Sequence, residues 1–242
     1  MPTVSRQIFA FSVVLKPGPD GRGSFDLIDH ALGLAATGGP VKVCYVPTAV
    51  GDSQLNVDFY TAAFERRTDV ELSVLRLFIQ PSVPDVRGHL LSQQVILVEG
   101  GSVVNLMAVW RAHGLPQILR ECWDAGVVLA GASAGSLCWH VGGPTDSFGD
   151  TLDPFTDGLG LVPYSNGVHD DLDDQPRRQV YRDLVAARLL PAGYATEDGV
   201  GLHYLGTELH EAVSILEGKH AWWVRPDGEG RWTEQAVAPR LI

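Results

Sequence analysis

The sequence predicts an α/β fold in which helices cover both faces of a mostly parallel sheet. Apolar runs typical of buried strands occur at residues 7–15, 41–46, 72–78 and 95–98. They alternate with segments of helical periodicity at residues 25–36, 54–67, 102–112 and 115–123. A further strand-like run, at residues 125–130, leads directly into the segment GASAGS. Such alternation is typical of parallel strands joined by crossover helices.

Individual elements carry their own signals. The helix at residues 54–67 places Phe59, Ala63 and Phe64 on one face. Ser102 follows a glycine pair and is expected to cap the next helix. In the last third, residues 193–204 and 207–214 resemble two strands around a Leu205-Gly206 turn. Residues 221–224 and 231–237 flank DGEG, a hairpin signal.

We expect these late strands to be antiparallel and to extend the edge of the sheet. No repeat, low-complexity tract or linker interrupts the 242 residues, so residues 1–242 are interpreted as a single domain.

Composition excludes several classes of function. Apolar residues make up 45% of the chain and the formal net charge is −11, which argues against a nucleic-acid surface. No apolar run is long enough to span a bilayer, and the first residues lack the features of a signal peptide. The cysteines Cys44, Cys122 and Cys138 are widely spaced, which predicts neither a zinc site nor a disulfide framework. We therefore expect a cytoplasmic protein without nucleic-acid or membrane partners, and we interpret Cys138 as a buried helix residue.

Ser133 lies within GASAGS, between the apolar run and a predicted helix. A strand that turns sharply into a helix with serine at its tip has the form of a nucleophile elbow. Small residues on both sides permit a strained turn and leave room for a substrate. The alternative interpretation is an ordinary glycine- and alanine-rich strand–helix turn.

A serine nucleophile needs a base, and the base needs an orienting acid. His169 is the best candidate for the base because it follows a predicted strand end within a loop. The acid remains open at this point. Asp198 lies between two strand-like segments, whereas a run of carboxylates follows His169 directly: Asp170, Asp171, Asp173 and Asp174. That run is also consistent with a solvated loop.

The other histidines are assigned no catalytic role. His140 is expected to face away from the Ser133 hydroxyl, and His203 alternates within a strand and is interpreted as structural. The rest are interpreted as surface residues: His30, His89, His113, His210 and His220.

A second glycine-rich turn, Gly100-Gly101, ends a strand and begins a helix. Such a turn can approach the elbow and offer a backbone N–H. Together, the amides of Gly101 and Ala134 would form an oxyanion hole. A phosphate-binding turn is the alternative, although the segment matches neither GxGxxG nor a Walker loop.

Four motifs, taken in order, resemble the serine peptidase family of aspartyl dipeptidase (peptidase E) and cyanophycinase. LVEGGS at residues 97–102 resembles the family's Val-Gly-Gly-Gly-Asn turn, and GASAG at residues 131–135 resembles its Gly-x-Ser-Ala-Gly elbow. GLGLVP at residues 158–163, leading to His169, resembles the segment that carries the catalytic histidine. TEDG at residues 196–199 resembles the late acidic motif.

The resemblance implies a three-layer α/β/α sandwich related to class I glutamine amidotransferases. It implies that Ser133 is the nucleophile, His169 the base and Asp198 the orienting acid. The oxyanion donors would be Gly101 and Ala134, and no metal or organic cofactor would be needed.

The sequence departs from the peptidase E pattern at the substrate site. Ser102 stands where that family has Asn, and DQPR at residues 174–177 replaces Gly-Glu-Thr-Arg, whose arginine recognises an acidic side chain. Arg177 or Arg178 could supply the positive charge, or either could be a surface residue of the following helix.

The resulting hypothesis is a serine peptidase that hydrolyses short peptides, such as dipeptides with N-terminal Asp. Two alternatives stay open: a cyanophycinase-like hydrolase of β-aspartyl-arginine units, and a catalytically silent amidotransferase-like domain that binds a small ligand or a partner. The expected partner is a small peptide substrate, and a homodimer is one expected assembly.

Overall fold

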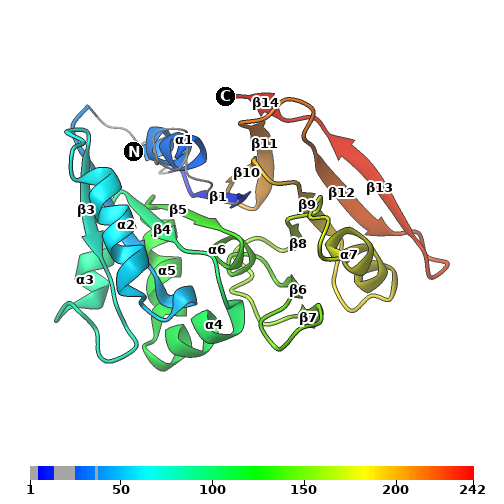
Figure 1. Cartoon of the computed structure of the whole chain (residues 1–242), viewed down its shortest axis with the longest axis horizontal. Helices are drawn as coiled ribbons and strands as arrows, with labels where there is room; N and C mark the ends of the chain where they lie inside the picture. Colours follow the sequence, from blue (N-terminus) through cyan, green and yellow to red (C-terminus); the bar gives the residue numbers. More distant parts are fainter. Residues whose placement is uncertain (1–4, 14–24, 36–37) are drawn as a thin grey trace.

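A parallel sheet forms the centre of the molecule. The computed structural model describes residues 5–13, 25–35 and 38–242. Within these residues the largest sheet has eight strands in the order β14-β11-β10-β1-β5-β4-β2-β3 (Figure 1). Five of them run parallel to one another: β1 (Gln7–Ser12), β5 (Val128–Ala132), β4 (Val95–Val98), β2 (Val41–Val46) and β3 (Val70–Val74).

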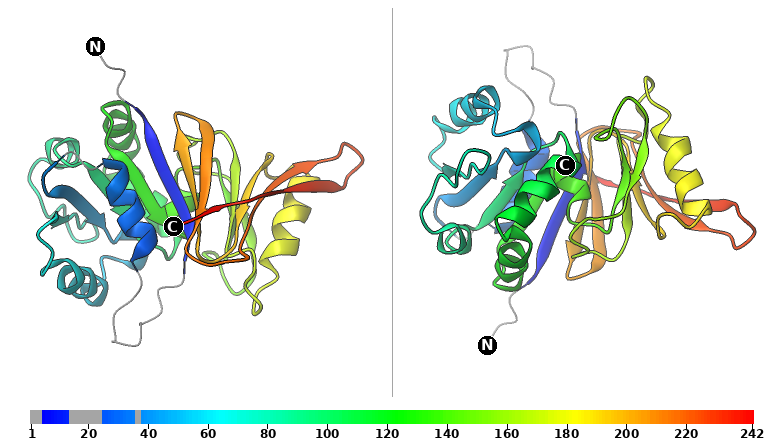
Figure 2. Two further views of the ribbon diagram at one scale, coloured as in Figure 1. Left: turned by 90° about the horizontal axis from the view of Figure 1, so that it is seen from above. Right: turned by 90° about the horizontal axis from the view of Figure 1, so that it is seen from below.

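Helices cover both faces of this sheet, as Figure 2 shows. One face packs on α4 (Val103–Ala112) and α5 (Leu115–Asp124), and the other packs on α1 (Asp26–Ala35) and α2 (Gln54–Phe64). Strand β5 shows why two cores form. Leu129 joins the core on the α4–α5 side, whereas its neighbours Val128 and Ala130 join the opposite core, because alternate side chains of a strand point to opposite faces. The predicted three-layer α/β/α sandwich is confirmed.

The main sheet continues with antiparallel strands. β10 (Val200–Leu205) pairs antiparallel with β1, and β11 (Glu208–Ser214) pairs antiparallel with β10. The short β14 (Arg240–Leu241) closes the edge beside β11. The expectation of late antiparallel strands at the sheet edge is therefore confirmed for β10 and β11.

The expectation of one strand over residues 193–204 is wrong. The segment contains β9 (Gly193–Thr196) and β10, which belong to two different sheets. The extended backbone is interrupted at Gly199, whose φ of 90° is accessible to glycine without strain. The predicted hairpin is present as β12 (Ala221–Pro226) and β13 (Trp232–Val237), but it pairs with β9 and not with the main sheet.

This second sheet has the order β13-β12-β9-β8, where β8 is Ser165–Val168. Helix α7 (Arg177–Ala186) packs on it through Tyr181 and Val185, which share a small core with Val224. The hairpin extends away from the rest of the molecule (Figures 1 and 2).

Short elements complete the described chain. They are the 3-10 helix η1 (Thr48–Val50), α3 (Val86–Leu91), α6 (Ala134–Leu137), and the strands β6 (Gly143–Thr145) and β7 (Asp153–Phe155).

Several predicted boundaries shift. The strand expected at residues 72–78 is Val70–Val74, and the helix expected at residues 54–67 ends at Phe64. Strand β1 ends at Ser12, and the last two residues of the predicted strand 7–15 lie outside the described residues, as does Ala36 of the predicted helix 25–36. The Ser102 cap is confirmed, because its side chain accepts a hydrogen bond from the Asn105 amide.

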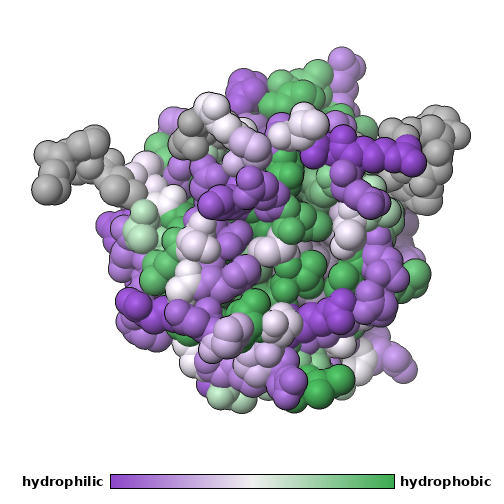
Figure 3. Space-filling model, turned by 90° about the vertical axis from the view of Figure 1, so that its left-hand side faces the viewer, coloured by the Kyte–Doolittle hydropathy of each residue, from purple (hydrophilic) through white to green (hydrophobic). Residues whose placement is uncertain are grey.

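The face that carries the β3 edge intersperses hydrophobic with hydrophilic residues (Figure 3). A mixed surface of this kind disfavours pairing of the sheet edge with another chain. Among the described residues, no helix is both long and apolar enough to cross a membrane.

Candidate active site

Ser133 stands at a sharp turn between β5 and α6. Its backbone has φ 54° and ψ −111°, and its N–H donates to the Phe11 carbonyl of β1 at 3.0 Å. The turn depends on close backbone contacts. A Cβ atom on Gly131 would lie 2.3 Å from the Gly135 carbonyl oxygen, and one on Gly135 would lie 2.4 Å from that of Val98. Glycines on both sides therefore permit the elbow geometry that the segment GASAGS predicts.

The second glycine turn approaches this elbow. A Cβ atom on Gly100 would lie 3.2 Å from the Ser133 Cβ, and Gly101 has φ 129°. The Gly100 N–H donates to Glu99 Oε1 at 3.0 Å. Within the described residues the N–H groups of Gly101 and Ala134 donate no hydrogen bond. These are the two amides that the sequence predicts as oxyanion donors.

His169 follows β8 directly and is largely buried. Its own backbone has φ 57°, and its N–H donates to Ser12 Oγ at 3.1 Å. Ser12 Oγ in turn lies 2.7 Å from Thr196 Oγ1 on β9. The histidine is therefore held at the point where the ends of β1, β8 and β9 meet.

Asp198 lies in the loop between β9 and β10 and contacts His169. His169 Nδ1 and Asp198 Oδ1 are 2.5 Å apart. The contact that the sequence predicts for Asp198 is confirmed. A carboxylate at Nδ1 favours the tautomer that carries its proton there, which leaves Nε2 free to accept a proton.

The competing carboxylates after His169 have other partners. Asp170 is buried and accepts hydrogen bonds from Arg178 at 2.7 Å and Arg182 at 2.6 Å. Asp171 Oδ1 accepts the backbone N–H of Asp198 at 2.8 Å, and its other oxygen pairs with Lys219. Burial opposes ionisation of Asp171, but the hydrogen bonds from Lys219 and the Asp198 amide outweigh it and lower its pKa. Asp171 thus anchors the loop that carries Asp198.

Ser133 and His169 line the same cavity, whose volume is about 520 Å³. Gly101 and Arg177 also line it, together with mostly polar residues: Ser102, Asn105, Asp146, Ser147, Leu172, Asp174 and Gln175. No hydrogen bond joins Ser133 Oγ to another side chain among the described residues. Such contacts are commonly long in enzymes without substrate. Another cavity of similar size lies beside α7, and neither Ser133 nor His169 lines it.

The two candidate arginines lie in different environments. Arg177 lines the Ser133 cavity, where it donates to Asp146 at 2.9 Å and to Gln175 at 2.7 Å. Arg178 turns away, pairs with Asp170 and with Glu234 at 2.5 Å, and lies over the Trp222 ring. Arg178 therefore does not line the Ser133 cavity, and it bridges α7 to β13 instead.

A second cavity, of about 280 Å³, reaches Ser133 from the α2 side. Phe11, Phe59 and Tyr60 line it, and so does Glu99. Glu99 Oε2 accepts the Tyr45 hydroxyl at 2.5 Å, and burial raises the pKa of Glu99. Sequence reasoning missed this cavity. Its one available signal was the acidic residue immediately before the glycine pair.

Two residues near the elbow do not enter the site. Cys138 is fully buried, and burial raises the pKa of its thiol well above the ordinary value. His140 is buried and bonds to the Ser136 carbonyl and the Tyr204 hydroxyl. Both interpretations made from the sequence are confirmed: Cys138 is a core residue and His140 faces away from Ser133.

Comparison with solved structures supports the fold. A peptidase from an acI-B1 actinobacterium superposes with a TM-score of 0.70 at 17% identity, covering 98% of this chain and 96% of that one. A putative peptidase E protein from Listeria monocytogenes EGD-e gives 0.63 at 18% identity, covering 88% of this chain and 100% of that one.

Sequence comparison goes further. The uncharacterised peptidase YgaJ of Bacillus subtilis (strain 168) is 40% identical over 185 residues, which cover 76% of this chain and 77% of the relative. The sequence profile of Peptidase family S51 matches residues 18–212, a span that contains the elbow, the glycine turn, His169 and Asp198. The resemblance inferred from the four motifs is thereby confirmed, and the chain belongs to peptidase family S51.

Proposed function

We propose that the chain is a serine peptidase that hydrolyses short peptides, with Ser133 as nucleophile, His169 as base and Asp198 as orienting acid. The observation that carries the proposal is the 2.5 Å contact between His169 and Asp198 beside a cavity that Ser133 shares. A carboxylate, an imidazole and an elbow serine are the three groups that serine hydrolysis requires.

In the proposed reaction, His169 Nε2 takes the proton of the Ser133 hydroxyl as Oγ attacks the scissile carbonyl. The resulting oxyanion accepts hydrogen bonds from the Gly101 and Ala134 amides. His169 then gives its proton to the leaving amine, and an acyl-enzyme forms. A water molecule, activated in the same way, releases the acid and restores Ser133.

The dimensions of the site favour short substrates. The polar cavity and the aromatic cavity meet at Ser133, and their volumes of about 520 and 280 Å³ suit a few residues of peptide. We assign one cavity to each side of the scissile bond.

A serine-directed fluorophosphonate probe tests the chemistry. We expect the probe to label wild-type protein at Ser133 and to leave folded Ser133→Ala and His169→Ala unlabelled or labelled only slowly. A folded wild-type protein that resists the probe and cleaves no peptide would instead support the silent binding domain.

Arg177 is the candidate determinant of a preference for N-terminal Asp. Its side chain is 9% exposed and is already paired with Asp146, so a substrate carboxylate has to share the guanidinium. A charge-assisted hydrogen bond contributes roughly 1.5–3 kcal/mol, and this sharing favours the lower end, or about tenfold in selectivity.

The measurement is kcat/KM for Asp-Leu and Asn-Leu with wild type and Arg177→Gln. We expect the wild type to prefer Asp-Leu and the variant to lose that preference while it still cleaves Asn-Leu. Equal values in the wild type would remove the aspartyl preference and leave the serine peptidase standing.

The cyanophycinase-like alternative deserves the same assay, because one observation favours it. Asp174 lines the cavity, and it makes no ion pair within the described chain. A substrate arginine could use that carboxylate, so β-Asp-Arg belongs in the substrate panel.

A further inference from the structure

A cluster of two histidines and a glutamate lies on the outer strands of the main sheet. In the pairing of β10 with β11, His203 lies opposite Glu211 and Tyr204 lies opposite Leu209, so His210 is the extra residue of a β-bulge. A bulge sets two residues of one strand against one of its partner, which brings His210 and Glu211 together beside His203. One nitrogen of each imidazole and one Glu211 oxygen all lie within 4.8 Å of one another.

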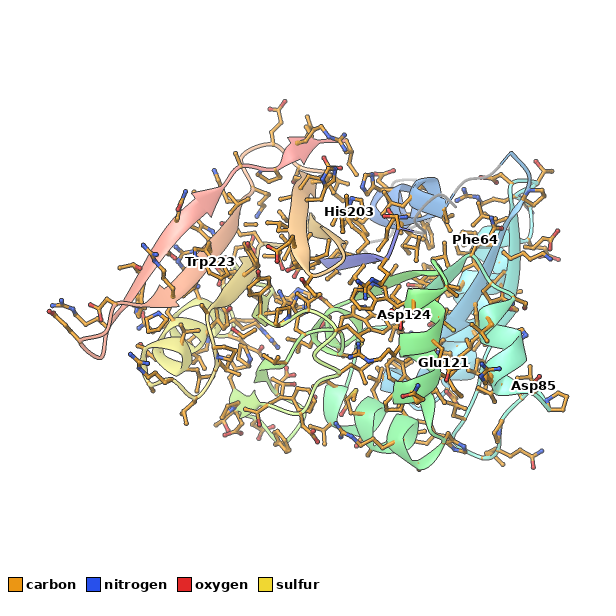
Figure 4. The ribbon with its side chains drawn as sticks, turned by 180° about the vertical axis from the view of Figure 1, so that it is seen from behind. Phe64, Asp85, Glu121, Asp124, His203 and Trp223 are labelled. Carbon is orange, nitrogen blue, oxygen red and sulfur yellow. The ribbon has the colours of Figure 1, made fainter. Side chains whose placement is uncertain are left out.

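His203 is the buried member of the cluster, with 4% of its surface exposed. Figure 4 shows it where the late strands meet α1. Its Nε2 lies 3.0 Å from Gln7 Oε1, while the Gln7 amide nitrogen donates to the Leu34 carbonyl at 3.4 Å. The carbonyl oxygen of Gln7 therefore faces the ring and favours a proton on Nε2. Nδ1 is left with a lone pair and has no hydrogen-bond partner in the described structure.

This arrangement matches that of a metal-binding histidine. A ligating imidazole commonly donates its other N–H to an oxygen, which fixes the ring and its tautomer.

His30 of α1 adds a related observation. Its Nε2 is also buried without a partner, and its ring packs 4.9 Å from that of Phe9, the β1 neighbour of His203. Buried nitrogens without partners are uncommon in folded proteins and call for an explanation. A cation bound through Nδ1 of His203 would give that nitrogen a partner.

We propose that His203, His210 and Glu211 bind a divalent transition metal ion of the borderline class, such as Zn²⁺. Two imidazoles and a carboxylate are a donor set that zinc accepts, with water in the remaining position. The ion would tie β10 to β11 and would take no part in the chemistry at Ser133. The proposal departs from the expectation, drawn from the sequence, that no metal is bound.

Arg240 opposes the ion, because it holds Glu211 through two hydrogen bonds of 2.9 and 3.0 Å. Its side chain is 56% exposed, so it can release the carboxylate into solvent. Removing this positive charge should therefore strengthen metal binding.

The test is calorimetric titration of Zn²⁺ into the untagged, chelator-treated full chain at pH 7.5. We expect one site of micromolar affinity or tighter. We expect His210→Asn and Glu211→Gln to weaken it at least tenfold, because each removes a ligand. We expect Arg240→Gln to tighten it. His210 is exposed and Glu211 is half-exposed, so their variants should fold. They test the proposal even if His203→Gln fails to fold.

The controls separate this site from other imidazoles. His113→Asn, at the C-terminal end of α4, and His169→Ala, in the Ser133 cavity, should each leave the Zn²⁺ affinity unchanged. The proposal is overturned if the wild type does not bind Zn²⁺ with a Kd below about 100 µM, or about −5.5 kcal/mol. Binding that survives both His210→Asn and Glu211→Gln also overturns it. Peptidase activity enters neither outcome, so the result does not depend on the proposed function.

Discussion

At Ser133 the backbone takes φ 54° and ψ −111°, a conformation in which a side chain is strained by roughly 1–3 kcal/mol. The strain persists because the turn is held on both sides. The Ser133 N–H bonds to Phe11, and the glycines at residues 131 and 135 pack against backbone oxygens. The same geometry lifts the hydroxyl out of the strand and into the cavity with His169.

This strain predicts an unusual ranking of two inactive variants. Ser133→Gly should be more stable than Ser133→Ala by about 1 kcal/mol, because glycine adopts positive φ at little cost. Urea unfolding measures the difference. As a control, Ala108→Gly on the exposed face of α4 should show the opposite sign, a loss of about 1 kcal/mol. An elbow at which alanine is the more stable residue would contradict the assigned strain.

Asp198→Asn tests the orienting acid. An amide can offer His169 its NH₂ group and so favour the wrong tautomer, and we expect kcat to fall by about 10⁴-fold. The Asp198 backbone N–H, which holds the loop to Asp171, is unaffected by this change. The matched control is Asp173→Asn, an exposed carboxylate of the same acidic run, which should stay near wild-type activity. A variant within tenfold of wild type would reject Asp198 as the acid.

Single residues also show where sequence reasoning reaches its limit. From the residues alone the acid stays open between Asp198 and the carboxylates that follow His169, and the family resemblance is what implies Asp198. Arg177 and Arg178 could not be distinguished, because neighbours on a helix point about 100° apart and the sequence does not reveal which side faces the cavity. Glu99, directly after β4, contacts Tyr45 of β2, and no local sequence pattern records this contact.

Among the elements, α7 is attached to the second sheet by an ionic network. Asp170, Arg182 and Glu234 connect the loop after β8, the helix and β13, and the Asp170 and Arg182 side chains are each 1% exposed. Burial raises the pKa of Asp170 even though two arginines contact it. The network therefore orders α7 beside the Ser133 cavity, and it gives Asp170 a structural role.

Asp170→Asn should then cost stability. Removing one partner of a buried ion pair leaves charge uncompensated, and we expect a loss of about 3 kcal/mol, at the lower end of the usual range because Glu234 still contacts Arg182. Urea unfolding of the variant and of the control Asp173→Asn measures this loss. A stable Asp170→Asn protein that has lost activity would instead favour Asp170 as a catalytic group.

The elements predicted best are those whose periodicity is local. The parallel core strands, the Ser102 cap and the β12–β13 hairpin all follow from spacing or turn residues within a few positions. The second sheet does not. In residues 193–204 two short strand-like segments flank the polar residues TEDG at 196–199. The sheet that the first segment joins is decided by the pairing of β9 with β8 and β12. Those partners are tens of residues away in the chain.

At the scale of the whole molecule, one of the hydrophobic clusters spans both sheets. Val168 of β8 and Ala221 of β12 belong to the same buried cluster as Leu129 of β5 and Leu202 of β10. The proposed active site lies at this junction, since Ser133 comes from the main sheet and His169 from the end of the second. A cluster that packs against both sheets holds Ser133 and His169 at a fixed relative position.

A shared core also predicts that the chain unfolds as one unit, as the single-domain interpretation requires. In calorimetry the van't Hoff and calorimetric enthalpies of unfolding should agree.

The variant Val224→Ala provides a sharper test of this coupling, because Val224 is fully buried in the small core of the second sheet. Truncating this side chain should lower the free energy of unfolding by about 2 kcal/mol and lower Tm by about 6 °C. If the sheets are coupled, this local change moves the entire transition. If the sheets are independent, the second sheet unfolds in a separate transition at lower temperature while the Tm of the main transition stays unchanged. Residues 1–242 then form two folding units.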